Sequence, residues 1–133
     1  MPATSSWMIR ASLAYLVAGF TIGGLLLAEK GVSFWPQAWR LLPLHAEILI
    51  TGWLVQLALG VAFWIMPRLR GGQRGDLQLS KAAAAAYNLG ILTSLAALWF
   101  QVPAALAAGR VLEAGGAAFF LITIWSRVRT IQR

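Results

Sequence analysis

Four long apolar stretches set the strongest limit on how this chain can fold. They cover about residues 7–28, 44–66, 82–100 and 106–125. A bilayer core about 30 Å thick needs roughly 20 apolar helical residues at 1.5 Å each, so every stretch is long enough to cross a membrane. Strands of a membrane barrel would show short alternating segments, which the sequence lacks. The sequence therefore predicts an all-α, integral membrane four-helix bundle.

The composition supports a membrane protein with a single domain. Of the 133 residues, 59% are hydrophobic and 11% are charged, against about 25% charged in soluble domains. A chain of this length has room for one domain, which we expect to cover residues 1–133. The first apolar stretch is too long for the core of a signal peptide and has no convincing cleavage site, so we expect it to remain as a helix.

The basic residues between the apolar stretches predict the orientation of the chain. Eight fall on one side of the membrane, namely Arg10, Arg68, Arg70, Arg74, Lys81, Arg127, Arg129 and Arg133. Three fall on the other, namely Lys30, Arg40 and Arg110. Because cytoplasmic segments carry the excess of Lys and Arg, both termini are predicted to be cytoplasmic, in a multi-pass protein of the inner (cytoplasmic) membrane. The net charge of +7 thus indicates topology, and no nucleic-acid partner is expected.

His45 is the only histidine of the chain, and there is no cysteine. The predicted topology places it near the outer end of the second span. A projection at 100° per residue puts Gly52, Gln56 and Phe63 within about 20° of His45, with Gly60 beside that stripe. The two glycines remove side-chain bulk below the histidine. A single histidine is a weak motif, so this pattern is compatible with both a ligand and an interfacial polar residue.

Charged residues within the spans are costly, and they usually pair or serve a site. Glu47 projects to nearly the opposite side of the helix from His45, which predicts that it pairs with Arg110 or with another subunit. Arg110 and Glu113 are one helical turn apart and can pair with each other. Glycines elsewhere, such as Gly23 and Gly116, are expected to permit close packing of helices.

The segment LHAEILITGWLVQLALGVAFWIMPR resembles the second transmembrane helix of the haem-copper oxidase and nitric oxide reductase catalytic subunits. In that family the helix begins with a haem-ligating histidine, carries glycines in its middle, and ends in an aromatic pair and a proline. The corresponding residues here are His45, Gly52, Gly60, Phe63, Trp64 and Pro67. The preceding segment SLAYLVAGFTIGGLLLAEKGV is similar to the first span of the family, so the likeness covers roughly residues 10–70.

The resemblance implies a haem b whose iron is ligated by His45. The porphyrin would lie against Gly52 and Gly60, with Gln56 and Phe63 along its lower edge. Haem propionates are anionic and usually bind Arg or Lys, and the two candidates on the outer side of the membrane are Arg40 and Arg110.

The family also has about twelve helices and several further histidine ligands, which this chain lacks. A complete oxygen or nitric oxide reductase is therefore excluded for this chain alone. Two copies could share one haem between their His45 side chains, or each copy could bind its own haem with an open position for a gas. Either arrangement predicts electron transfer or gas or haem sensing, with a redox partner or respiratory complex as partner.

The competing prediction is an accessory or structural subunit of a respiratory membrane complex that has no cofactor of its own. Its glycine faces would pack on a partner, and His45 would form a hydrogen bond between helices. A transporter or channel subunit is disfavoured, because the sequence shows no helix broken in mid-membrane and no charge at that depth.

Overall fold

The computed structural model of the chain describes residues 1–67, 76–125 and 127–128, and all its regular elements are helical. Four helical stretches within these residues are long and apolar enough to cross a membrane. They are Ala3–Gly31, Pro36–Ile65, Leu77–Phe100 and Pro103–Trp125. The predicted number of spans and their order along the chain are confirmed, and each helical stretch begins several residues earlier than predicted.

The first, third and fourth spans are single helices, whereas the second changes helix type along its length. The single helices are α1 (Ala3–Gly31), α4 (Leu77–Phe100) and α5 (Pro103–Trp125). The second span consists of the 3₁₀ helix η1 (Pro36–Leu41), α2 (Leu42–Glu47), the π-helix η2 (Ile48–Val55) and α3 (Gln56–Ile65). A π-helix has more residues per turn than an α-helix, so a projection at 100° per residue is only approximate through η2.

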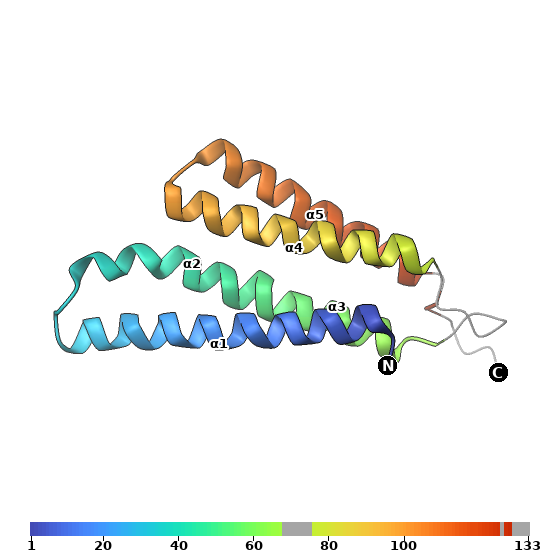
Figure 1. Cartoon of the computed structure of the whole chain (residues 1–133), viewed down its shortest axis with the longest axis horizontal. Helices are drawn as coiled ribbons and strands as arrows, with labels where there is room; N and C mark the ends of the chain where they lie inside the picture. Colours follow the sequence, from blue (N-terminus) through green and yellow to red (C-terminus); the bar gives the residue numbers. More distant parts are fainter. Residues whose placement is uncertain (68–75, 126, 129–133) are drawn as a thin grey trace.

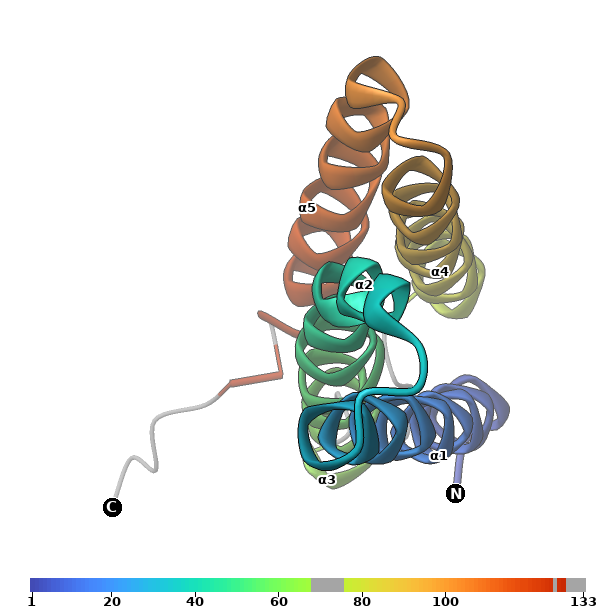
Figure 2. The ribbon, with the colours of Figure 1, turned by 90° about the vertical axis from the view of Figure 1, so that its left-hand side faces the viewer.

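The chain forms two helical hairpins, which Figure 1 shows as two pairs of roughly parallel rods. The second span lies between α1 and the α4–α5 pair in the end view of Figure 2. The N-terminus, the end of α3, the start of α4 and the end of α5 share one end of the molecule (Figure 1). The same helix ends were placed together when the basic residues were assigned to one side of the membrane. Of the basic residues used there, Arg68, Arg70, Arg74, Arg129 and Arg133 lie outside the described residues.

The apolar core lies toward the end of the molecule that carries the N-terminus. It comprises Met8, Leu59, Phe63, Ala83, Ala84, Phe120 and Ile124, contributed by α1, α3, α4 and α5. At its centre the rings of Phe63 and Phe120 have centroids 5.4 Å apart. Hydrophobic contact therefore joins the two hairpins at this end.

Arg127 closes the same end from just beyond α5. Its guanidinium is fully buried and donates to the last carbonyls of the second span, at 2.9 Å to Phe63 O and 2.5 Å to Met66 O. Its Nε donates to Pro67 O at 2.9 Å. Carbonyls at a helix C-terminus lack helical partners and carry partial negative charge, so a buried cation is well placed there. A residue that counted as a topology signal in the sequence thus also caps α3.

Helices α4 and α5 approach so closely that their contact requires glycine. A Cβ atom added to Gly90 would lie 2.6 Å from the backbone nitrogen of Glu113, and one added to Gly116 would lie 2.6 Å from that of Tyr87. No Cβ fits at such distances without moving a backbone. The expectation that glycines permit close packing is confirmed here, and it applies to the second hairpin as much as to the first.

Gly116→Ala should destabilise the protein relative to Gly115→Ala. Both changes gain the same helix propensity, but a Cβ at Gly115 meets nothing within 4 Å. We expect the two variants to differ by about 1–3 kcal/mol, the usual cost of overpacking. Reversible unfolding in detergent, followed by the helical circular dichroism signal, measures the difference. Equal stabilities would show that α4 and α5 are not in backbone contact at this position.

Candidate functional site

His45 lies in α2, half-buried, with its imidazole packed on α1. A Cβ atom added to Gly23 would lie 2.6 Å from Cε1 of the ring, so the missing side chain of this glycine is what makes room for the histidine. Nδ1 of His45 is 2.9 Å from the carbonyl oxygen of Gly19. Because a carbonyl oxygen only accepts, this contact assigns the proton to Nδ1 and leaves the lone pair of the neutral ring on Nε2.

Nε2 of His45 has no hydrogen-bond partner among the described residues. Metal-binding histidines usually donate their other ring N–H to a carbonyl or carboxylate, which fixes both the tautomer and the orientation of the ring. His45 has this arrangement with Gly19. In the part of the chain that the structure describes, no three His, Cys, Asp or Glu side chains come together as a metal site. His45 can thus supply one ligand to an iron whose other ligands come from a porphyrin.

The rest of the stripe below His45 forms the contact between the second span and α1. A Cβ on Gly52 would lie 2.7 Å from Cγ of Tyr15, and one on Gly60 would lie 3.1 Å from Cβ of Met8. Gln56 is fully buried and donates to Met8 O at 3.3 Å. The projected common face of His45, Gly52, Gln56 and Gly60 is therefore real, but α1 of the same chain fills the space in which the porphyrin was expected to lie.

Phe63 and the two arginines expected at the haem edge are in three different places. Phe63 is in the apolar core against Phe120, at the far end of the second span. Arg40 lies in η1, is exposed, and forms no ion pair with a described residue. Arg110 is bound by two carboxylates. Of the seven residues predicted for the site, His45 and Arg40 each have a polar group outside the buried interior with no hydrogen-bond or ion-pair partner among the described residues, whereas the unpaired Oε1 of Gln56 is buried.

Glu47, Arg110 and Glu113 form a cluster of charges between the hairpins. Nη2 of Arg110 is 2.5 Å from Oε2 of Glu47, and Nη1 is 3.0 Å from Oε2 of Glu113. Both carboxylates are buried, whereas the arginine side chain is 47% exposed. The predicted pairing of Arg110 with Glu47 and with Glu113 is confirmed. Here α2 and α5 are joined by charge rather than by apolar contact.

Two hydroxyl groups donate to the carboxylates of this cluster and a third donates to a backbone carbonyl beside it, and none of the three was predicted from the sequence. Thr51 donates to Oε1 of Glu47 at 2.7 Å, and Ser94 donates to Oε1 of Glu113 at 2.5 Å. The hydroxyl of Tyr87 donates to the carbonyl of Thr51 at 2.8 Å, inside the π-helix η2. Such donors lower the cost of burying two carboxylates beside a single cation. A signal for Ser94 exists in the sequence, since it lies one helical turn from Gly90 on the face that contacts α5.

No protein-family model, no curated protein sequence and no solved structure matches this chain.

Arg110→Gln should destabilise the protein, while Arg40→Gln should change the free energy of unfolding by less than about 0.5 kcal/mol. The first variant leaves the buried carboxylates of Glu47 and Glu113 without a cation. Because the guanidinium is 47% exposed, we expect a loss on the order of 2 kcal/mol, below the roughly 3–5 kcal/mol of a fully buried pair.

The same comparison has a pH signature. Protonated carboxyl groups need no cation, so the deficit of Arg110→Gln should shrink as the pH is lowered. Unfolding in detergent at several pH values measures this. Equal stability of the two arginine variants at neutral pH would mean that the cluster does not hold the hairpins together.

Proposed function

We propose that this chain is a haem b-binding membrane protein in which His45 supplies an axial ligand to the iron. The observation that supports the proposal most strongly is the hydrogen bonding of the His45 imidazole. Nδ1 is held by the Gly19 carbonyl, and Nε2 has no partner among the described residues. The likeness of residues 10–70 to the first two helices of the haem-copper oxidase family supports the same assignment.

The porphyrin cannot lie on Gly52 and Gly60 as long as α1 packs there. It would instead approach His45 from the side that α1 leaves open. Gly24, next to Gly23, faces open space, with nothing within 4 Å of an added Cβ. Arg40 precedes His45 in the same span and, of the two arginines considered for a propionate, is the one without an ion pair among the described residues, because Arg110 already binds two carboxylates.

A second copy of the chain would supply the second ligand. The sequence contains one histidine and no cysteine, so one chain offers a single strong nitrogen or sulfur ligand beside its three methionines. A twofold axis near His45 would bring two imidazoles to one iron and would cover the half-exposed side of the ring. The proposed assembly is a homodimer that shares one haem.

The role of such a site is electron transfer or sensing of haem or a gas. The cofactor supplies the redox chemistry, and the chain supplies ligation and an apolar surrounding that tunes the potential. The proposal does not extend to reduction of oxygen or nitric oxide, for which the family uses several additional histidines. The proposed location is the inner membrane with both termini in the cytoplasm.

Haem binding should depend on His45 and on the glycine beneath it. His45→Ala should abolish the Soret band of the purified protein. Gly23→Ala should weaken haem retention, because the new Cβ would lie 2.6 Å from the present position of Cε1. Gly31→Ala, at the end of the same helix and also with nothing within 4 Å of an added Cβ, is the matched control and should retain haem. Absorption spectra, with circular dichroism to verify folding, measure all three. A wild-type protein that stays colourless after reconstitution with haem would contradict the proposal.

The orientation can be tested with single cysteines, because the natural chain has none. Ser33→Cys lies between α1 and η1, and Gln78→Cys lies in the first turn of α4 at the opposite end. A membrane-impermeant maleimide added to intact cells should label the first variant only. Labelling of Gln78→Cys without permeabilisation would reverse the proposed topology.

One observation favours the accessory-subunit function as a second candidate. Most residues first assigned to the haem site have structural contacts in the chain itself, as with Gly52 on Tyr15 and Gly60 on Met8. In that case His45 would only join α1 to α2 through Gly19. This function predicts co-purification with other subunits of a complex and no loss of assembly in His45→Ala.

A further inference from the structure

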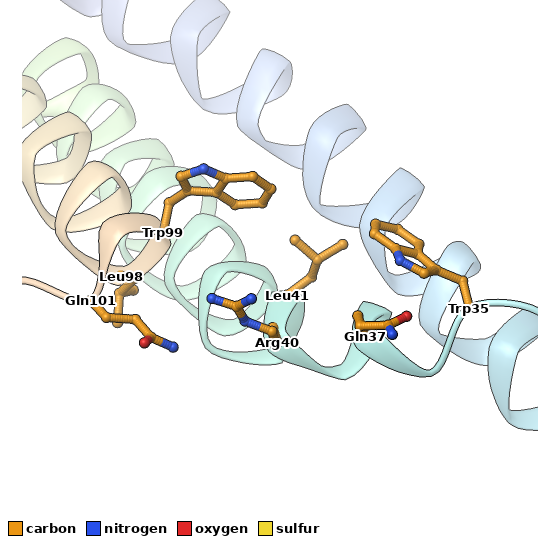
Figure 3. Close-up of a pocket in the computed structure, with 7 residues that line it drawn as sticks. All are labelled: Trp35, Gln37, Arg40, Leu41, Leu98, Trp99 and Gln101. Atoms are coloured by element: carbon orange, nitrogen blue, oxygen red, sulfur yellow. The ribbon is translucent and has the colours of Figure 1, made fainter.

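A pocket of about 220 Å³ opens at the end of the molecule opposite the N-terminus. Figure 3 shows its lining, which comes from η1 of the first hairpin and from the C-terminal end of α4 in the second. Arg40 and Gln37 contribute from η1, and Gln101 contributes from the end of α4. Trp35 and Trp99 complete the polar part of the wall. The pocket therefore spans the two hairpins where the apolar core does not reach.

Arg40 gives this pocket a positive charge that no acidic residue of the chain balances. The sequence has four acidic residues, and none forms an ion pair with Arg40, although Glu29 adjoins the pocket at the backbone of Trp35. Glu29 accepts the backbone N–H groups of Phe34 at 2.9 Å and Trp35 at 2.5 Å. Asp76 caps α4 at the other end of the molecule.

The remaining two acidic residues are Glu47 and Glu113, and both bind Arg110. The guanidinium of Arg40 consequently has no ion-pair partner among the described residues. The pocket thus presents an unbalanced cation.

Gln101 lines the pocket in a backbone conformation that favours glycine. Its φ of 58° lies in the left-handed region, and it is the one non-glycine residue with positive φ among those described. This position ends α4, where glycine is the usual residue because a Cβ is disfavoured there. Glutamine is less stable than glycine in this backbone conformation, but its side chain places an amide in the pocket wall beside Arg40 (Figure 3).

We propose that this pocket binds the phosphate headgroup of an anionic phospholipid. The guanidinium of Arg40 suits two oxygens of a phosphate, and the amides of Gln37 and Gln101 can donate to its ester and glycerol oxygens. Trp35 and Trp99 are half-exposed, as expected of indoles at the membrane–water interface. Leu41 and Leu98 provide an apolar wall for the start of an acyl chain.

A lipid headgroup accounts for this wall better than free phosphate does. Inorganic phosphate would use the cation and the amides but leave the indoles and leucines without a role. A lipid bound here would contact both hairpins and connect them beyond the Glu47–Arg110 ion pair. Arg40 is also the cation proposed for a haem propionate, so the two anions would compete for it, and the lipid site is tested on protein without haem, where its failure is distinct from a failure of haem binding.

The test compares lipid retention by native mass spectrometry after reconstitution into nanodiscs of phosphatidylcholine with or without phosphatidylglycerol. The wild type should retain phosphatidylglycerol in preference to phosphatidylcholine. Arg40→Gln should reduce this preference about tenfold, as expected for a lost charge-assisted pair. Lys30→Gln removes an exposed cation at the same end that does not line the pocket, and it should keep the preference.

The variant Gln101→Gly distinguishes a loss of lipid binding from a loss of stability. Glycine adopts the left-handed conformation without cost, so this variant should be at least as stable as the wild type and still lose part of the phosphatidylglycerol preference. An unchanged preference in Arg40→Gln, or an equal loss in Lys30→Gln, would overturn the proposal. Displacement of the lipid by millimolar inorganic phosphate would overturn the assignment to a lipid and leave a phosphate site.

Discussion

The arrangement of the chain depends on the ion pair between Arg110 of α5 and Glu47 of the second span. The apolar core joins the hairpins only toward the end that carries the N-terminus, where Phe63 meets Phe120. Toward the other end the hairpins are joined by one guanidinium and two buried carboxylates, with hydroxyl donors from Thr51 and Ser94. In a membrane these groups have few alternatives, because exposure of a carboxylate to lipid is costly. The pairing therefore fixes which side of the second span faces α5.

Fixing that side also fixes the surroundings of His45. Glu47 is directed at α5, so His45, two residues earlier, is directed at α1, where Gly23 leaves space for the ring and Gly19 accepts its N–H. The polar residues of the second span thus fall into two groups with different roles. The group around Glu47 is internally paired and holds the hairpins together. The other group ends in one imidazole nitrogen without a partner among the described residues, which is why the proposed function rests on His45.

The sequence alone was sufficient to predict those features whose absence would cost a large free energy in a membrane. Four apolar stretches of membrane length were predicted, and the pairing of Glu47 with Arg110 was one of two predicted alternatives, because lipid penalises an exposed backbone and an unpaired charge. What packs on the face of the second span below His45 was not predictable in the same way. A helical projection shows which residues share a face, as His45 and Gly52 do, but it does not show that Tyr15 of another helix occupies that face.

The π-helix Ile48–Val55 was not predictable from the sequence either, because its residues are also compatible with an α-helix. The left-handed conformation of Gln101 was not predictable, because glycine is the usual residue in that conformation. What the structure adds is a location for the polar groups of the residues that it describes. It leaves a single imidazole nitrogen as the point at which a cofactor could be ligated. Of the two arginines considered for a propionate, it leaves Arg40 without an ion-pair partner among the described residues.

The ratio of haem to chain in the purified wild-type protein, measured together with the spin state of its ferric iron, tests this account most directly. A haem shared by two His45 side chains predicts one haem for two chains and a low-spin iron with two imidazole ligands. One high-spin haem for each chain would contradict the shared site and place an open iron in every copy. Purified chains that bind no haem would contradict the account of His45 as a ligand altogether.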